Sequence, residues 1–598
     1  MSDQRSDSSA PIDLADPEDA RGAIPVVFGA GPDQCAGFYH PAVDDPAGEA
    51  VLICAPWGWD EVASYRPRRR LAEFLAGEGH PTLRFDLPGT GDSTGEPDEP
   101  EVLEAWITAI ESATGWLRGR GAERVAVVGL GLGGLLAREA VRRGLPVEDL
   151  VIWGAPASGR AFVREIKAFA RLQTSRGDDA GALPEGWQEV GGYVLTAETL
   201  AALKALPAEV GAPPSLSRAL LMKRDGVGGD ESYAEALRAA GVEVAVDEGE
   251  GWSGVINHPE SSMMPPAAAS RIARWLEEAA APPTYYSPVE GSAALTLPDG
   301  VVETPFVFRR EARDLYGVLA MPAEARDDGL CAVLLNAGAI QHTGPNRLWT
   351  EAARRWAAAG VPALRLDLEG IGEADGDEWR MHETGDFYEL RFVDQVIDVL
   401  DALTRQGIGE RFLCAGLCSG AYWSVQAALA DERVEAAVML NGGALSWHER
   451  LADNRAVHRF DRVFSLDWWR RLVRGDIRRP SVAEFASVLR ARLRGLWRTV
   501  RAKVGPGSKG SGPIASDLDR LRARGVRVVL AFSGGEALAR ELADEGVAER
   551  LDEWPNVVRR TLPGNDHTLR SLPAQEAAAE ILDAELNRAA AAAKPQSP

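Results

Sequence analysis

The sequence is short of cysteine, of long apolar runs and of positive charge, and each shortage excludes a class of protein. Five cysteines in 598 residues are an odd number and lie mostly within apolar runs, which fits reduced thiols better than a disulfide framework. No run of 18 uncharged apolar residues is present, so no ordinary transmembrane helix is expected. Residues 1–20 are acidic and lack the apolar core of a signal peptide. We therefore expect a cytoplasmic protein.

The charge balance and the spacing of possible ligands exclude further classes. The net charge is −24 and the isoelectric point is about 4.9, which disfavours broad binding to nucleic acid or to an anionic membrane. The cysteines show no metal-ligand spacing, so neither a metal nor another cofactor is expected. With 45% hydrophobic and 26% charged residues the composition is that of a globular protein, and the length requires at least two domains.

Short apolar runs alternate with helix-like segments, and the pattern occurs twice. Asp86 and Asp367 each open an Asp-Leu-x-Gly-x-Gly loop, and they lie 281 positions apart (367 − 86). A repeat of this length is the duplication of a whole domain, and the alternation predicts an α/β fold with two mostly parallel, doubly wound sheets. The predicted strands lie at 51–55, 82–86, 124–128, 331–335, 363–367, 411–415 and 526–532, and the predicted helices at 65–79, 101–119, 347–359 and 386–406.

Composition and the repeat together predict the domain boundaries. A Pro-rich join at Pro282-Pro283 separates the two halves. The predicted parts are a disordered tail at 1–21, a first α/β domain at 22–285, a second at 286–587 with an insertion at about 444–512, and a disordered tail at 588–598.

The most informative stretch is Gly416-Leu417-Cys418-Ser419-Gly420, between an apolar run and a helix-like segment. A strand that reverses into a helix within about two residues needs small flanking residues and presents the middle side chain at the turn. The pattern has the G-x-S-x-G form of a nucleophile elbow with a thiol in place of the hydroxyl, so Cys418 is the candidate nucleophile. The alternative is a buried core thiol in an unreactive turn.

On these motifs the chain resembles the α/β-hydrolase fold, and more narrowly the serine-aminopeptidase-like hydrolases found with exosortase A systems. The second half is similar to the first type of these hydrolases, which carry a Gly-Leu-Cys elbow, here Gly416-Leu417-Cys418. The first half is similar to the second type, whose elbow lacks a usable nucleophile. The resemblance covers most of residues 22–585 and implies two tandem α/β-hydrolase domains.

In an α/β-hydrolase the acid and the base follow the nucleophile, on loops after later strands. His567, in a turn before the last helix-like segment, is the candidate base; its alternative is a surface or capping histidine. Glu536, after a Gly-Gly turn, is the candidate acid, with Asp544 and Glu541 as alternatives. A thiol with a pKa of about 8.5 is only a few percent ionised at neutral pH, so an imidazole beside it is needed to raise the thiolate fraction.

Two backbone N–H groups are candidate donors to an oxyanion. That of Ser419 directly follows the nucleophile, and that of Ala339 lies in the loop after the first strand of the second core. His342, nearby, is on the wrong loop for the base and is interpreted as a pocket or turn residue.

The first half lacks a nucleophile. Gly131 occupies the elbow position, although Asp230 and His258 mirror the acid and the base of the second half. We therefore predict a pseudo-enzyme that packs against, shapes or regulates its partner. The alternative is that Ser93 has replaced the nucleophile, but Asp92 and Ser93 fit a turn cap better.

The insertion at about 444–512 is rich in Trp and Arg. In the family that the chain resembles, an insertion here forms a helical lid. Arg binds phosphate or carboxylate bidentately, so such a lid fits an acyl carrier protein, a coenzyme A thioester or an acidic substrate. A solvated basic face and contact with a membrane surface are the alternatives.

Together these residues predict a cysteine-nucleophile hydrolase that acts on an ester, thioester or amide through an acyl-enzyme. An acyltransferase or cyclase that uses a carrier-bound acyl thioester is the alternative among enzymes, because an acyl-thiolate also reacts with amines and thiols. The alternative of another class is a non-catalytic binding or scaffold protein.

Overall fold

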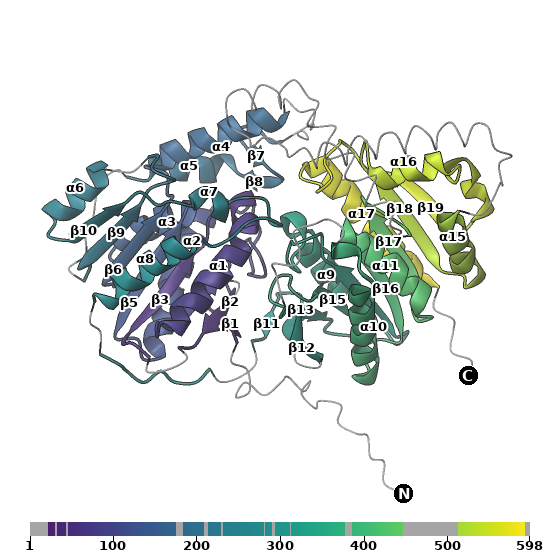
Figure 1. Ribbon diagram of the computed structural model, residues 1–598, viewed down its shortest axis with the longest axis horizontal. Coiled ribbons are helices and arrows are strands. Elements are labelled where there is room, and N and C mark those ends of the chain that lie inside the picture. Colours follow the sequence, from purple (N-terminus) through teal and green to yellow (C-terminus); the bar gives the residue numbers. More distant parts are fainter. Residues whose placement is uncertain are drawn as a thin grey trace, which may run out of the picture.

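The computed structural model describes residues 22–592, except 30–32, 43–45, 175–182, 208–212, 214, 229–230, 280–281, 290–292, 311–312, 377–385 and 447–511. Figure 1 shows two α/β units side by side, the first in purple to teal and the second in teal-green to yellow. Almost all of the insertion predicted at 444–512, and the tail predicted at 1–21, lie outside the described residues.

The first half is built on an eight-stranded sheet in the order β1-β2-β4-β3-β5-β6-β9-β10. β1, β2 and β4 pair antiparallel, whereas every pair from β4 to β10 is parallel. Central strands such as β3 are buried along their whole length, as the continuous apolar runs predict. The strands are β1 (Ile24–Phe28), β2 (Cys35–His40), β3 (Glu49–Cys54), β4 (Thr82–Phe85), β5 (Arg124–Leu130), β6 (Asp149–Trp153), β9 (Arg218–Met222) and β10 (Glu243–Asp247); β7 (Gln188–Val190) and β8 (Tyr193–Leu195) form a separate hairpin.

The second half repeats this order in a nine-stranded sheet, β11-β12-β13-β15-β14-β16-β17-β18-β19. β12 and β13 take the places of β1 and β2, and the strands from β15 to β19 form the parallel part. The duplication therefore extends to the sheet topology. The strands are β11 (Leu295–Thr296), β12 (Val302–Arg310), β13 (Arg313–Met321), β14 (Leu330–Leu335), β15 (Ala363–Asp367), β16 (Arg411–Leu417), β17 (Val434–Leu440), β18 (Arg527–Phe532) and β19 (Val557–Thr561).

Helices cover both faces of each sheet (Figure 1). α1 and α8 pack on one face of the first sheet and α2 and α3 on the other, while α9 and α17 face α10, α11 and α15 across the second sheet. This arrangement confirms the predicted fold class, two tandem α/β domains that each have a mostly parallel, doubly wound sheet. The helices are α1 (Trp59–Gly77), α2 (Val102–Gly119), α3 (Leu132–Arg142), α4 (Gly159–Thr174), α5 (Ala197–Ala205), α6 (Glu231–Ala239), α7 (Trp252–Val255), α8 (Pro266–Glu277), α9 (Leu348–Ala358), α10 (Leu390–Arg405), α11 (Ser419–Ala430), α15 (Pro513–Ala523), α16 (Ala537–Asp544) and α17 (Leu572–Ala591).

The ends of three helices differ from the predictions. α10 begins at Leu390 rather than at 386, and Asp386–Tyr388 forms a separate short 3-10 helix. α1 begins at Trp59 rather than at 65, directly after Gly58, whose φ of 72° ends the preceding turn. α17 continues to Ala591, so residues 588–591, predicted to belong to the disordered tail, are helical. The reason is packing: Leu586 and Ala589 are buried against the second sheet and hold the last turns of the helix in place.

Candidate active site

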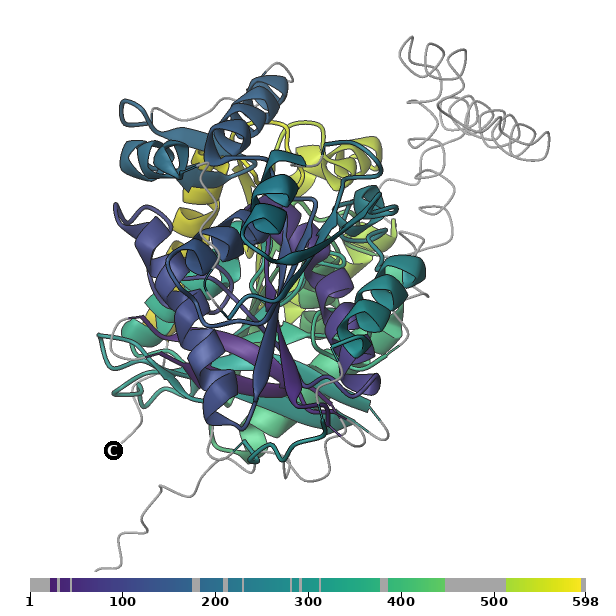
Figure 2. The same ribbon diagram turned by 90° about the vertical axis from the view of Figure 1, so that its left-hand side faces the viewer.

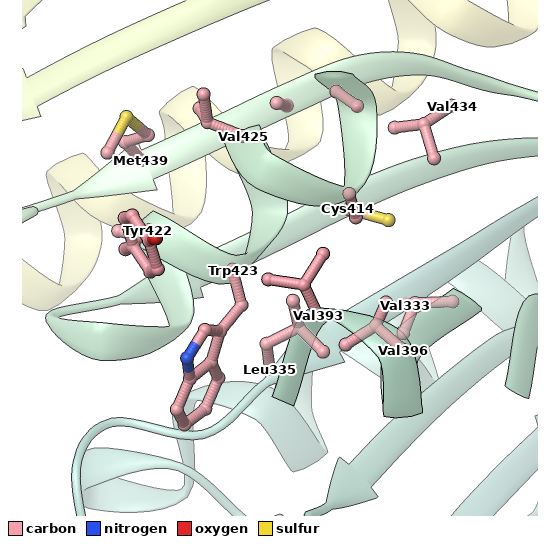
Figure 3. Packing of buried hydrophobic residues seen from close by; sticks show 14 of the residues in the cluster. Val333, Leu335, Val393, Val396, Cys414, Tyr422, Trp423, Val425, Val434 and Met439 are labelled. Atoms are coloured by element: carbon pink, nitrogen blue, oxygen red, sulfur yellow. The ribbon is translucent and has the colours of Figure 1, made fainter. Parts of the chain in front are cut away.

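Cys418 lies at the sharp turn between β16 and α11. Its φ of 58° and ψ of −112° are unfavourable for a residue with a Cβ, so the surrounding structure must impose them. The turn needs glycine on both sides, because a Cβ on Gly416 would lie 2.1 Å from the Gly420 carbonyl carbon, and one on Gly420 would lie 2.3 Å from the Asn336 oxygen. Figure 3 shows the core beneath this turn, where Trp423 of α11 packs among buried aliphatic side chains.

The structure brings His567 and Glu536 to the Cys418 side chain. His567 Nδ1 lies 2.9 Å from Glu536 Oε2, and Cys418 lies near enough to the ring to act on its pKa. Burial by itself lowers the pKa of His567, but the charges and hydrogen bonds of Cys418 and Glu536 raise it well above its ordinary value. Since the carboxylate holds Nδ1, the other ring nitrogen is the one available to the thiol.

Nearby carboxylates have other surroundings. Asp566 adjoins the histidine in sequence, but its side chain accepts two hydrogen bonds of 2.9 Å from Arg570. Asp544 is exposed at the end of α16, and Glu541 lies within that helix, whereas Glu536 is its N-cap residue and points back at His567.

Cys418 is the most accessible of the thiols. All five cysteines lie in the described part of the chain and are free; four are buried, with exposed fractions of 1% or less, and Cys418 is partly exposed. Burial raises the pKa of Cys35, Cys54 and Cys331 to about 12, and burial likewise raises the pKa of Cys414. A thiol reagent therefore meets Cys418 first.

The predicted oxyanion donors belong to two segments that contact each other. Ser419 is the first residue of α11, so its N–H has no acceptor within the helix. Across from it, the Gly338 N–H donates to Ser419 Oγ at 3.1 Å, which leaves the next amide of the loop, that of Ala339, as the second candidate donor. Asn336 Nδ2 closes the same loop by donating to the Ile340 oxygen at 3.1 Å.

Asn441 is a site residue that the sequence reasoning missed. It follows β17, is completely buried, and its Nδ2 donates to the His567 carbonyl oxygen at 2.9 Å and to Ser533 Oγ at 3.0 Å. Its Oδ1 accepts the Ser533 N–H at 2.7 Å. One amide side chain thus ties the loop of the candidate acid to the loop of the candidate base. A polar residue followed by two glycines at the end of a buried central strand was the available signal.

His342 lies in a turn, as interpreted from the sequence, but its side chain and that of Asp92 form a buried contact between the halves, so the Asp92 carboxylate is no mere turn cap. His342 Nε2 lies 2.7 Å from Asp92 Oδ2 of the first half, and Nδ1 lies 2.7 Å from Asp367 Oδ2. Burial lowers the pKa of His342, but the two carboxylates outweigh it and raise this pKa to about 10, so the ring is a cation at neutral pH. Ser93 is completely buried and donates to the Asp86 carbonyl oxygen at 2.6 Å, so it is no nucleophile.

The corresponding site of the first half is filled. Gly131 keeps the elbow conformation, with a φ of 52° and a ψ of −122°, but a Cβ there would already lie 3.0 Å from Pro56 and 3.7 Å from the Trp252 ring. His258, predicted to mirror the base, is exposed and pairs with Glu260 at 3.8 Å. Asp230, predicted to mirror the acid, lies outside the described residues.

Within the described ranges, no helix has the length and apolar character needed to cross a bilayer, and no cluster of His, Cys, Asp or Glu side chains is suited to hold a metal ion.

Comparisons with known proteins find similar structures but no similar sequence. No family model and no curated protein matches the chain. The similar solved structures include a proline iminopeptidase from Mycobacterium smegmatis (17% identity, 48% of this chain and 100% of that chain, TM-score 0.29). They also include a thioesterase domain from the curacin biosynthetic pathway (15% identity, 47% of this chain and 98% of that chain, TM-score 0.28). A third is Est1E from Butyrivibrio proteoclasticus with ferulic acid bound (12% identity, 48% of this chain and 99% of that chain, TM-score 0.31). Each spans about half of this chain.

Proposed function

We propose that the protein is a cysteine-nucleophile α/β-hydrolase that cleaves an ester, thioester or amide through an acyl-enzyme on Cys418. One observation carries this proposal: a partly exposed thiol at a strained turn lies beside an imidazole whose Nδ1 is 2.9 Å from the carboxylate of Glu536. Nothing in core packing requires a strained turn to present a sulfur to a histidine, whereas nucleophilic catalysis requires each of these features.

The proposed reaction assigns each group one task. His567 takes the proton from the Cys418 sulfur, and the thiolate forms a bond to the carbonyl carbon of the substrate while the carbonyl electron pair moves to oxygen. The N–H groups of Ser419 and Ala339 stabilise that oxyanion. The oxyanion then collapses, the bond to the leaving group breaks, and His567 returns the proton to the departing alcohol, thiol or amine. Glu536 keeps the ring oriented and stabilises its positive charge.

Water activated by His567 would release the acid and free the thiol. The same acyl-thiolate favours a second candidate function, acyl transfer or cyclisation, because a thioester reacts readily with amines and thiols as well as with water. An acyl carrier protein or a coenzyme A thioester is then the proposed acyl donor. A cysteine where most such elbows carry serine is the observation that supports this candidate.

Alkylation by iodoacetamide from pH 5 to 9, with hydrolysis of p-nitrophenyl esters and acyl thioesters, tests the proposal. We expect Cys418 to be alkylated well below the pH at which a free thiol reacts, and Cys418→Ala to lose both alkylation and turnover. Since the other four cysteines are buried, the label reports on one site. Mass spectrometry of the acylated protein, offered water, amines or thiols, separates hydrolysis from transfer.

A scaffold protein would give a different result. Its Cys418 would react like an ordinary thiol, and Cys418→Ala would leave any ester hydrolysis unchanged. That pair of results would overturn the enzyme proposal.

A further inference from the structure

In the contact between the two halves, one arginine–carboxylate pair occurs twice. Arg84 of the first half binds Glu373 of the second, and Arg365 of the second binds Asp92 of the first. The second arginine and the second carboxylate lie 281 positions from their counterparts (365 − 84 and 373 − 92), so the contact is two-fold symmetric, as in a homodimer. All four side chains are exposed by 10% or less, and removing one member of a buried ion pair is costly. The halves therefore form one fixed unit.

One part of this contact reaches the loop that carries the candidate oxyanion donor Ala339. Asp92 holds His342 at the end of that loop, and His342 in turn holds Asp367. Asp367 Oδ1 accepts a hydrogen bond of 2.8 Å from Asn336, the residue that closes the loop. A carboxylate of the first half is thus connected through charged hydrogen bonds to the loop that carries Ala339.

A second part of the contact reaches the loop that carries His567. The tip of the β7–β8 hairpin, residues 191–192, lies against this loop and the start of α17. Figure 2 views the molecule from the side of the first half, with the second half behind it. Gln575 of α17 donates to the Gly192 oxygen at 3.1 Å, and a Cβ on Gly192 would lie 2.5 Å from the Arg570 oxygen. Tyr193 packs against the same apolar cluster as Cys418 and Leu569.

The backbone of the His567 loop needs such support. Leu569 has a φ of 57°, which is strained for a leucine, and its side chain is completely buried. The apolar cluster around it includes Val62, and Trp59 packs against that cluster; both belong to α1 of the first half. A strained backbone conformation persists only where the packing around it imposes it. Around Leu569, part of that packing comes from the first half.

We propose that the first half is a positioning domain, which holds the oxyanion loop through Asp92 and the base loop through the β7–β8 hairpin, so that the site on the second half is complete only when both are in place. Asp92, Gly192 and Gln575 are positioning residues, and none of them touches a reacting atom. This inference rests on the proposed function, since the groups that these residues position are the proposed oxyanion donor and the proposed base.

Gly192→Ala tests the base-loop contact directly. The new methyl group meets the Arg570 oxygen at 2.5 Å, so the loop or the hairpin must shift. We expect the alkylation rate of Cys418 at pH 6.5 and kcat each to fall by about 10-fold or more, with KM little changed, because His567 moves away from the sulfur. Gly241→Ala is the matched control, since its φ of 90° is close to the 88° of Gly192 and a Cβ there meets nothing within 4 Å.

Two further variants keep the test decisive. Gln575→Ala removes the hydrogen bond to the Gly192 oxygen without adding bulk. We expect the alkylation rate of Cys418 and kcat to fall in this variant too, but by less. This variant tests the contact even if Gly192→Ala is unstable. Asp92→Asn acts on the oxyanion loop, so we expect kcat to fall while alkylation stays at the wild-type rate, because alkylation forms no oxyanion.

The outcomes also separate this inference from the proposed function. If Gly192→Ala and Gln575→Ala both match Gly241→Ala in alkylation and in kcat, while wild-type Cys418 is activated, the positioning role is wrong and the enzyme stands. If wild-type Cys418 itself reacts like a free thiol, the proposed function fails first.

Discussion

At the scale of single residues, the site depends on one thiol held in an unfavourable backbone conformation. Cys418 gains nothing from its positive φ as a packing residue, because a glycine, as at Gly131 in the first half, adopts the same turn without strain. The second half has a side chain at this turn, whereas the first half has none. Strain at such a turn is retained where the exposed atom has a use.

The carboxylate behind His567 gives the first prediction at this scale. Glu536→Gln should lower kcat by about 10²- to 10⁴-fold, because an amide neither fixes the productive tautomer nor stabilises the imidazolium. Steady-state kinetics on an acyl thioester measures the loss, and an unchanged melting temperature shows that the fold is intact. Asp544→Asn is the matched control, because Asp544 is exposed at the end of the helix that Glu536 precedes. Equal losses in the two variants would contradict the assignment of the acid.

At the scale of elements, the site is assembled from loops at the carboxyl ends of parallel strands. Cys418 follows β16, Asn441 follows β17, the candidate acid follows β18 and the candidate base follows β19. Parallel strands bring these ends to one edge of the sheet, so the sheet topology alone brings residues together that are far apart in the sequence. Asn441 joins three of the four loops through its own hydrogen bonds.

Asn441→Ala is the prediction at this scale. It leaves the buried Ser533 N–H and the His567 carbonyl oxygen without their partner, so we expect a loss of about 2–3 kcal/mol in the free energy of unfolding. We also expect slower alkylation of Cys418 at pH 6.5, because His567 is no longer fixed. Urea unfolding and the alkylation rate measure the two effects. Ser533→Ala removes a single bond to Asn441 and serves as the control; a comparable effect there would count against a linking role for Asn441.

At the scale of the whole molecule, the chain behaves as two copies of one fold locked by a buried ionic contact. Asp92, Asp367 and the Tyr316 ring, 5.3 Å away, surround His342, and Arg365 binds the same Asp92. Burial opposes the charge on this histidine, and the two carboxylates more than compensate, raising its pKa to about 10. The contact between the halves therefore includes a titratable cation.

This cation predicts how stability depends on pH. The folded-state pKa of His342 is about 10 and the unfolded value is near 6.5, so its contribution is complete below pH 6.5 and is lost as the pH rises toward 10. We expect the free energy of unfolding to fall by up to about 1.4 kcal/mol per pH unit in that window. Urea unfolding at pH 6 to 10 measures the slope. His342→Gln should flatten it, whereas His258→Gln, at an exposed side chain, should keep it; identical slopes in both variants would refute the buried cation.

Much of the fold followed from local sequence signals. The buried strands are continuous apolar runs because both faces of each sheet are covered, and the run predicted at 363–367 is β15. The elbow could be recognised because a strand-to-helix reversal needs glycine at Gly416 and Gly420, where a Cβ would overlap the backbone. The end of α17 was missed because tertiary packing, and not helix propensity, stabilises its last turns.

The sequence by itself determined the class of fold, its duplication, the elbow, and Cys418, His567 and Glu536 as candidates, because strand periodicity, turn chemistry and motif order are local properties. Only the tertiary structure decided what lies around them. It placed Asn441 between two loops, made His342 a buried cation paired with the other half, and set the β7–β8 hairpin against the His567 loop. These contacts join residues hundreds of positions apart, and no local pattern specifies which buried polar groups satisfy one another across an interface.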